Sequence, residues 1–179
     1  MNKKSFILLA LIALSLSAKA QFEAKINPFS ILWGSIDVAA EYGFSDNFGI
    51  DLAPTIAFDK QTLDDVEYKS TRAGVVVNPR YYFSPNKGLD KFYFGGYLKY
   101  MSGAYKSDGV IGWKNERFAG GFNIGYKIVA ESGFLFDIAF GGGKAFVNKN
   151  TSELDGIDLT LLDAINIDFV GKLAVGWRF

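Results

Sequence analysis

Large apolar residues alternate with small or polar ones along most of this chain. A period of two is typical of β-strands whose two faces meet different surroundings. Between Phe48 and Phe58 one face is almost wholly apolar, while the other carries glycine, alanine, threonine and Asp51. The same alternation continues to the last residue, Phe179. The pattern predicts strands at 22–31, 35–44, 48–58, 71–83, 91–103, 116–130, 134–146 and 165–179.

Charge separates the two faces of these strands. From the second segment onward, we expect the apolar face to carry no charged residue. The opposite face carries the charges Asp37, Glu41, Asp51, Arg72, Arg80, Lys99, Arg117, Lys127, Asp137, Asp168, Lys172 and Arg178. The fold class predicted is all-β, an eight-stranded antiparallel up-and-down transmembrane β-barrel.

The connections alternate between short and long. Short turns are expected at 45–47, 84–90 and 131–133, and longer polar loops at 59–70, 104–115 and 147–164, after a tight first connection near Trp33 and Gly34. Outer-membrane barrels combine short periplasmic turns with longer extracellular loops in this way. Apolar-face aromatic residues near the short turns then predict an aromatic girdle: Tyr42, Phe44, Phe48, Tyr81, Phe83, Phe92, Phe134, Trp177 and Phe179. A thinner second girdle is expected from Phe58, Tyr100, Phe118 and Phe146.

Residues 1–20 have the features of a secretory signal peptide. Lys3 and Lys4 precede an apolar run, and Ala18-Lys19-Ala20 predicts cleavage before Gln21. The predicted division is therefore a signal peptide at 1–20 and a barrel domain at 21–179. Removing three of 19 basic residues leaves 16 against 19 acidic ones, a net charge of −3 that gives no basic footprint for nucleic acid. The sequence has no cysteine, hence no disulfide scaffold.

Alternation alone leaves a second fold open. A soluble lipocalin-like binding barrel alternates equally well but turns its apolar face inward. The terminal aromatics and the mixed signs of charge on the polar face favour the membrane barrel. Pro54 and Pro79 lack the amide hydrogen that a strand ladder uses, so each is expected to mark a bulge or a strand end.

The stretch Lys25-Ile26-Asn27-Pro28-Phe29, followed by Gly34 and Glu41-Tyr42, resembles an uncharacterised family of small outer-membrane barrels. That family falls within the superfamily of OmpA-like barrels. The resemblance implies an eight-stranded barrel and no agreed activity. Phe179 is similar to the C-terminal signal that such proteins present to the barrel assembly machinery.

The sequence contains few residues that could support catalysis. Small outer-membrane enzymes that modify lipids use a histidine, and this chain has neither histidine nor cysteine. A carboxylate-only mechanism would have to use Asp37, Glu41, Asp51 or Asp137, which are expected instead to form structural ion pairs. No catalytic, cofactor-binding or metal-binding residue is predicted, and no cofactor.

Two loops contain acidic residues that could be metal ligands. One holds Asp59, Asp64, Asp65 and Glu67, and the other holds Glu153, Asp155, Asp158 and Asp163. Neither has the spacing of a calcium loop, so solvated acidic loops are expected. Gly141-Gly142-Gly143 lies within a strand and predicts curvature or tight packing.

The expected protein is a non-enzymatic integral protein of the Gram-negative outer membrane with a structural or surface-interaction role. A narrow, porin-like channel is the alternative. Its expected partners are membrane lipids, lipopolysaccharide and the assembly machinery; the extracellular ligand stays open. Because eight strands leave an interior only wide enough for side chains, a cross-barrel network of ion pairs is expected to close it. Glu41→Ala should then destabilise the fold more than truncation of an acid at 59–67.

Overall fold

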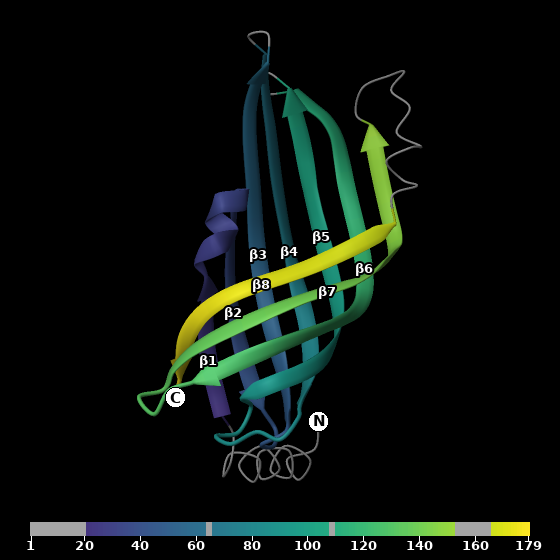
Figure 1. Ribbon diagram of the computed structural model, residues 1–179. Helices are drawn as coiled ribbons and strands as arrows, with labels where there is room; N and C mark the ends of the chain where they lie inside the picture. The colour runs from purple at the N-terminus through teal and green to yellow at the C-terminus, as the bar shows by residue number, and fades with distance from the viewer. Residues whose placement is uncertain (1–20, 64–65, 108–109, 153–165) are drawn as a thin grey trace, which may run out of the picture.

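The computed structural model describes residues 21–63, 66–107, 110–152 and 166–179, which form a closed antiparallel barrel (Figure 1). The predicted signal peptide at 1–20 lies outside the described residues. The elements are β1 (Gln21–Asn27), the 3₁₀ helix η2 (Pro28–Trp33), β2 (Ser35–Gly43), β3 (Phe48–Leu63), β4 (Val66–Tyr82), β5 (Lys91–Ser107), β6 (Val110–Val129), β7 (Phe134–Ser152) and β8 (Ile167–Arg178).

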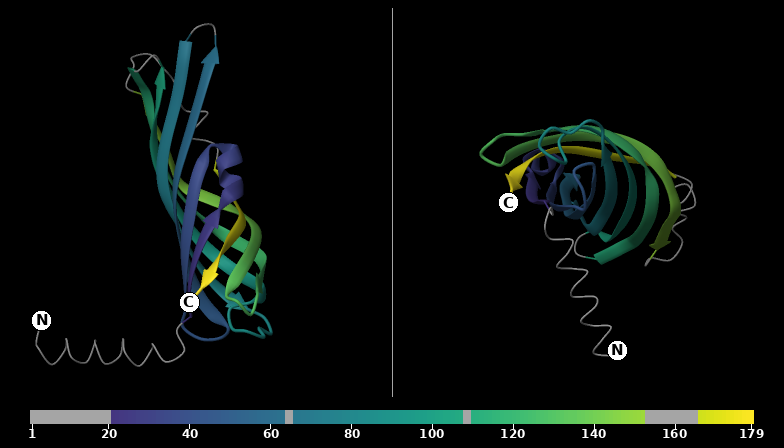
Figure 2. Two further views of the ribbon diagram at one scale, coloured as in Figure 1. Left: turned by 90° about the vertical axis from the view of Figure 1, so that its left-hand side faces the viewer. Right: turned by 90° about the horizontal axis from the view of Figure 1, so that it is seen from below.

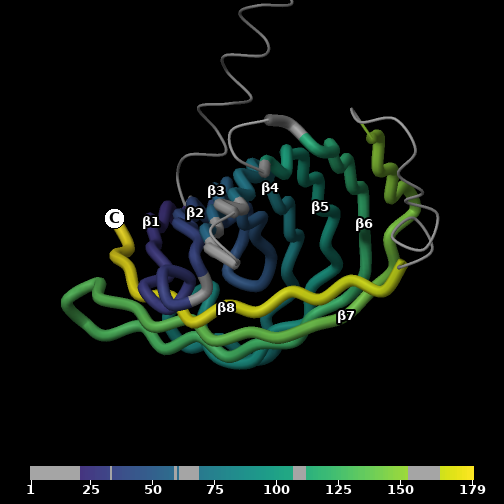
Figure 3. The backbone as a smooth tube through the Cα atoms, turned by 90° about the horizontal axis from the view of Figure 1, so that it is seen from above, coloured from purple at the N-terminus to yellow at the C-terminus, as the bar shows by residue number. Residues whose placement is uncertain are grey.

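Each strand pairs with its neighbour in the chain, and β1 closes the ring by pairing with β8. Viewed along the barrel axis, the strands follow one another around a ring (Figure 3). The eight-stranded antiparallel up-and-down barrel predicted from the alternation is therefore confirmed. Closure satisfies the backbone groups that an open sheet would leave unpaired at its edges.

The two ends of the barrel differ. The turn end comprises the short connections 44–47, 83–90 and 130–133, together with both ends of the described chain, where the Phe179 amide donates to the Phe22 carbonyl. At the opposite end, called here the extended end, β3 to β6 continue well past β1 and β2 (Figures 1 and 2).

This extension corrects three predicted loops. Most of 59–70 and 104–115 is strand, and 147–152 continues β7. Beyond the apolar belt, polar residues occur on both faces of the extended strands. The strict period of two therefore disappears although the ladder continues, as in the pair Asn115 and Asn150. The remainder of the third loop, with Glu153, Asp155, Asp158 and Asp163, lies outside the described residues, as do Asp64 and Asp65.

The first predicted segment is too long at its C-terminal end. β1 stops at Asn27 because Pro28, with its fixed φ and missing amide hydrogen, begins η2 instead of continuing the ladder. Gly34 then turns the chain into β2 with φ 68°. A Cβ at this position would lie 2.3 Å from the Phe58 carbonyl oxygen. The first connection is therefore a helical turn closed by glycine.

The interpretation of Pro54 and Pro79 was wrong. Both lie inside continuous strands: Pro54 is opposite Val75, and Pro79 is opposite Ile50. On the other side of each proline, the strand pairing is interrupted and then resumes in the same register. The amide hydrogen that proline lacks therefore falls where no residue pair is formed. The register shifts lie elsewhere, between Tyr105 and Lys106 and between Phe118 and Ala119.

The apolar face points outward and the charged face inward. Leu52 and Leu98 are 46% and 51% exposed, whereas Asp51 and Lys127 are 2% and 0% exposed. The lipocalin-like arrangement is therefore wrong for this barrel. Aromatic rings gather at the turn end as predicted, including the contacting pairs Tyr42–Phe44, Phe44–Phe48, Tyr81–Phe83, Phe83–Phe92 and Phe22–Phe179.

Lys144 corrects the expectation of an uncharged outer face. Its side chain is exposed, and Gly143 and Ala145 on either side of it belong to the inner face. It lies on the outer face close to Phe118 and Phe146, whose rings are 5.9 Å apart and belong to the second predicted girdle. A lysine near such a level can extend its ammonium beyond the apolar belt while its methylenes stay within it.

The glycine triplet confirms tight packing at two of its three positions. A Cβ on Gly143 would lie 2.2 Å from the Gly120 carbonyl oxygen and 2.7 Å from the Tyr97 hydroxyl, whereas one on Gly142 would meet nothing closer than 3.8 Å. We expect Gly143→Ala to cost about 1–3 kcal/mol of stability by overpacking, and Gly142→Ala to leave it nearly unchanged. Urea unfolding of the two variants measures the difference; equal effects would contradict this account of the packing.

Candidate functional site

The connection 83–90 folds back against the barrel interior at the turn end. Leu89 in this connection is fully buried and packs in a cluster with Tyr82, Tyr93 and Ala139. Its amide donates to the Asp46 carbonyl over 2.9 Å. Arg178 holds the same connection from β8, since its guanidinium donates to the carbonyls of residues 87–89. The short turn predicted from sequence thus places one apolar side chain, that of Leu89, inside the barrel, and this arrangement is called here the Leu89 plug.

Glu41 lies at the centre of a charged network just above this plug. Its carboxylate accepts hydrogen bonds from Arg80 over 3.1 Å and Lys127 over 2.9 Å, and it also pairs with Lys25. The Tyr82 hydroxyl donates to its second oxygen over 2.6 Å. Glu41 is fully buried. A buried carboxylate with this many donors is strongly engaged, and loss of any one partner would leave charge uncompensated.

Arg80 links this carboxylate to two others. Its guanidinium donates to Asp51 over 3.0 Å and to Asp137 over 2.8 Å, and its Nε donates to the side chain of Asn78 over 2.6 Å. The guanidinium also lies 4.6 Å from the ring centroid of Tyr93, a cation–π distance. This one side chain on β4 therefore reaches β2, β3 and β7 through hydrogen bonds and β5 through the ring of Tyr93.

Two members of the network, Glu23 and Lys25, were not among the charges predicted to face inward. Glu23 pairs with Lys127 over 2.7 Å and with Arg178, and Lys25 pairs with Asp51 over 2.8 Å and Asp137 over 3.1 Å. Both lie on β1, and the inward-facing charges were predicted only from the second segment onward. The alternation of Phe22 and Ile26 with Glu23 and Lys25 was the signal that could have identified them.

Glu41, Asp51 and Asp137 form the one group of acids in the described chain that could hold a metal ion, with ligand oxygens within 4.8 Å of one another. Lys25 and Arg80 each contact all three carboxylates. The side chains of Lys25 and Arg80 therefore already compensate the negative charge of the three carboxylates that a metal ion would otherwise compensate. These three acids are also three of the four carboxylates considered for catalysis, and they form structural ion pairs as expected.

Asp168 forms a second, smaller cluster nearer the extended end. Lys99 lies 2.9 Å from its carboxylate, Arg117 lies 3.4 Å away, and the Tyr97 hydroxyl donates to it over 2.9 Å. Asp37, the remaining acid considered for catalysis, accepts hydrogen bonds from Thr55 over 2.5 Å and Asn27 over 3.3 Å. It has no ion pair within the described structure.

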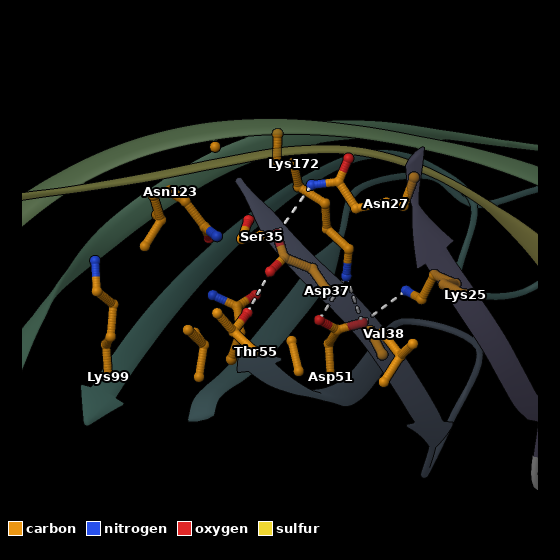
Figure 4. A pocket seen from close by; sticks show the side chains of 18 of the residues that line it. Lys25, Asn27, Ser35, Asp37, Val38, Asp51, Thr55, Lys99, Asn123 and Lys172 are labelled. Atoms are coloured by element: carbon orange, nitrogen blue, oxygen red, sulfur yellow. Dashed lines mark hydrogen bonds and ion pairs between the residues drawn. The ribbon is translucent and has the colours of Figure 1, made fainter. Parts of the chain in front are cut away.

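Two adjoining cavities occupy the interior between the network and the extended end. The lower one is about 280 Å³, and Lys25, Asp51 and Lys172 contribute to its lining (Figure 4). The upper one is about 470 Å³ and includes Tyr105 and Trp113. Buried side chains gather in the interior at the turn end, whereas two cavities occupy the part nearer the extended end. The expectation that side chains fill the interior therefore does not hold along the whole barrel.

None of the helical turns in the described ranges is long and apolar enough to span a membrane. No protein-family model matches the chain, and no curated protein matches it. Among solved structures, the chain is similar to the crystal structure of Ail, the attachment invasion locus protein of Yersinia pestis. The two share 12% identity with a TM-score of 0.44, over 89% of this chain and 96% of that one.

Proposed function

We propose that this protein is an integral β-barrel of the Gram-negative outer membrane. The observation that carries the proposal is the distribution of polarity: the barrel exposes a belt of large apolar side chains and buries the charges of the network around Glu41 and Arg80. In water that arrangement leaves the largest apolar surface hydrated, whereas in lipid it buries the same surface. Aromatic rings at one end of the belt fit the headgroup level.

The orientation follows from the unequal ends. The turn end faces the periplasm, and the extended end faces the exterior, as in barrels with short periplasmic turns. Residues 1–20 act as a signal peptide that is removed before Gln21. Lipids and lipopolysaccharide surround the belt, and the C-terminal strand ending at Phe179 engages the assembly machinery. No nucleic acid takes part.

The role proposed is structural or surface-interacting, and non-enzymatic. The network around Glu41 and Arg80 closes the interior, because its members are buried and paired across the barrel instead of lining an open path. The buried carboxylates are held by cations, and a chain without histidine or cysteine lacks both the side chain that most often acts as a base near neutral pH and the thiol nucleophile.

Fractionation of the native membrane tests the location. The mature protein should begin at Gln21, co-purify with the outer membrane, and migrate faster on a gel before boiling than after it. Recovery from the soluble periplasm, or retention of residues 1–20, would overturn the proposal.

The narrow channel is the second candidate, and the two cavities favour it because they hollow part of the interior. The network and the Leu89 plug oppose it. We expect planar-bilayer recordings of the purified, folded protein to show no steady conductance. Removing the anchor and the central cation together, in Leu89→Gly with Arg80→Ala, should raise conductance if the barrel still folds. Steady conductance from the unaltered protein would support the channel instead.

A further inference from the structure

The hollow half of the interior carries a cation, Arg72, for which the described residues provide no ion pair. Arg72 lines both cavities, and its buried Nε has no hydrogen-bond partner within the described structure. By contrast, Lys99 and Arg117 share Asp168, and Lys172 pairs with Asp51. Because a buried donor without a partner is costly, Arg72 marks the point where a ligand would gain most.

The strands around Arg72 provide room for an incoming group. Its direct neighbours are Ala57 on β3 and Gly103 on β5. A Cβ on Gly103 would lie 2.5 Å from the Arg72 Cγ, so the arginine side chain uses the space that glycine leaves. A guanidinium reached from one open side can hold a carboxylate or a phosphate through two parallel hydrogen bonds.

The lower cavity also contains acceptors that lack donors. The side-chain oxygens of Asn123 and Asn27 are buried without a partner, and the two residues are 7% and 9% exposed. Asn123 comes from β6 and Asn27 from the opposite part of the ring (Figure 4). Unsatisfied acceptors on two sides of a cavity that also holds an arginine donor suit a ligand carrying several hydroxyl groups, since a hydroxyl both donates and accepts.

The upper cavity adds a flat apolar surface. The rings of Tyr105 and Trp113 stack with centroids 4.5 Å apart and planes 14° apart. Asn115 lies in the same lining and donates to the side-chain oxygens of Asn148 over 3.2 Å and Asn150 over 2.9 Å. A saccharide ring matches this combination, because its carbon–hydrogen face packs on aromatic rings while its hydroxyls meet amides.

We propose that the two cavities form one binding site for a small acidic sugar, a saccharide carrying a carboxylate or a phosphate. Arg72 holds the anionic group, Asn27 and Asn123 accept from hydroxyls, and Trp113 with Tyr105 supports the ring. Cavities of about 280 and 470 Å³ fall near the lower part of the range of roughly 300–1,000 Å³ typical of small-molecule sites.

Calorimetric titration of the folded, detergent-solubilised mature protein tests this site without depending on its membrane location. Four probes separate the chemistry: glucuronate, glucose 6-phosphate, neutral glucose and inorganic phosphate. We expect at least one acidic sugar to bind tenfold or more tightly than glucose and phosphate. The stronger of the two acidic sugars identifies the anionic group as a carboxylate or a phosphate.

Variants assign the binding to named side chains. Arg72→Met should weaken acidic-sugar binding tenfold or more, and Asn123→Ala should weaken it several-fold. Lys144→Met removes a cation from the outer face and should change nothing. Gel mobility before and after boiling checks that each variant is folded. Inorganic phosphate binding as tightly as the sugars, unchanged binding in Arg72→Met, or no binding of any probe at millimolar concentration would each overturn the proposal.

Discussion

Glu41→Gln is expected to destabilise the barrel by about 3–5 kcal/mol, the cost of removing one partner from a buried ionic group. Glutamine keeps the size of the side chain but removes the charge that Lys25, Arg80 and Lys127 share. Because these cations are buried, water cannot replace the lost carboxylate. Urea unfolding in lipid vesicles measures the change.

Glu131→Gln is the matched control. Glu131 is exposed in the short connection between β6 and β7, so the same substitution there should change stability by less than about 0.5 kcal/mol. A double-mutant cycle of Glu41→Gln with Lys127→Met then isolates the interaction between these two side chains. The double variant should lose less stability than the sum of the losses of the two single variants. Additive losses, or equal effects at residues 41 and 131, would mean that the network does not hold the interior together.

The barrel, with its apolar residues outside and its charges inside, could be predicted from sequence because each strand of the belt has one apolar and one polar face. Leu52 and Asp51 face opposite ways for this reason, and their orientations were predicted correctly. The eight segments therefore had the right number, order and phase. Strand ends were less predictable, since η2 depends on Pro28 and the extension of β3 to β7 depends on pairing alone.

The site was predictable only in outline. The sequence gives the inward set of charges, but not which acid meets which base, because partners such as Lys25 and Asp137 lie far apart in the chain and meet through barrel closure. The Leu89 plug depends on a connection folding back into the interior, for which one leucine in a polar turn is a faint signal. The hollow upper half depends on small residues such as Gly103 facing inward beside Arg72.

The polarity of the outer face leads to the second large effect. Leu52→Arg is expected to cost about 2–4 kcal/mol when the barrel is folded in a bilayer, the range for arginine at the lipid-facing midplane of such barrels. Leu52 is exposed and lies between Phe48 and Phe58 on the outer face of β3, near the middle of the apolar belt. At that depth the guanidinium has neither water nor a counterion within easy reach.

Two further variants test whether depth in the membrane is the cause of the stability loss in Leu52→Arg. Leu52→Ala removes the side chain without adding charge and should cost much less than Leu52→Arg. Thr151→Arg places the same charge on the exposed extension of β7, beyond the belt, and should cost about 0–1 kcal/mol. Urea titration of all three in the same vesicles gives the comparison. If arginine at 52 is tolerated as well as arginine at 151, the belt faces water and the membrane assignment fails, whatever the stability of the interior network.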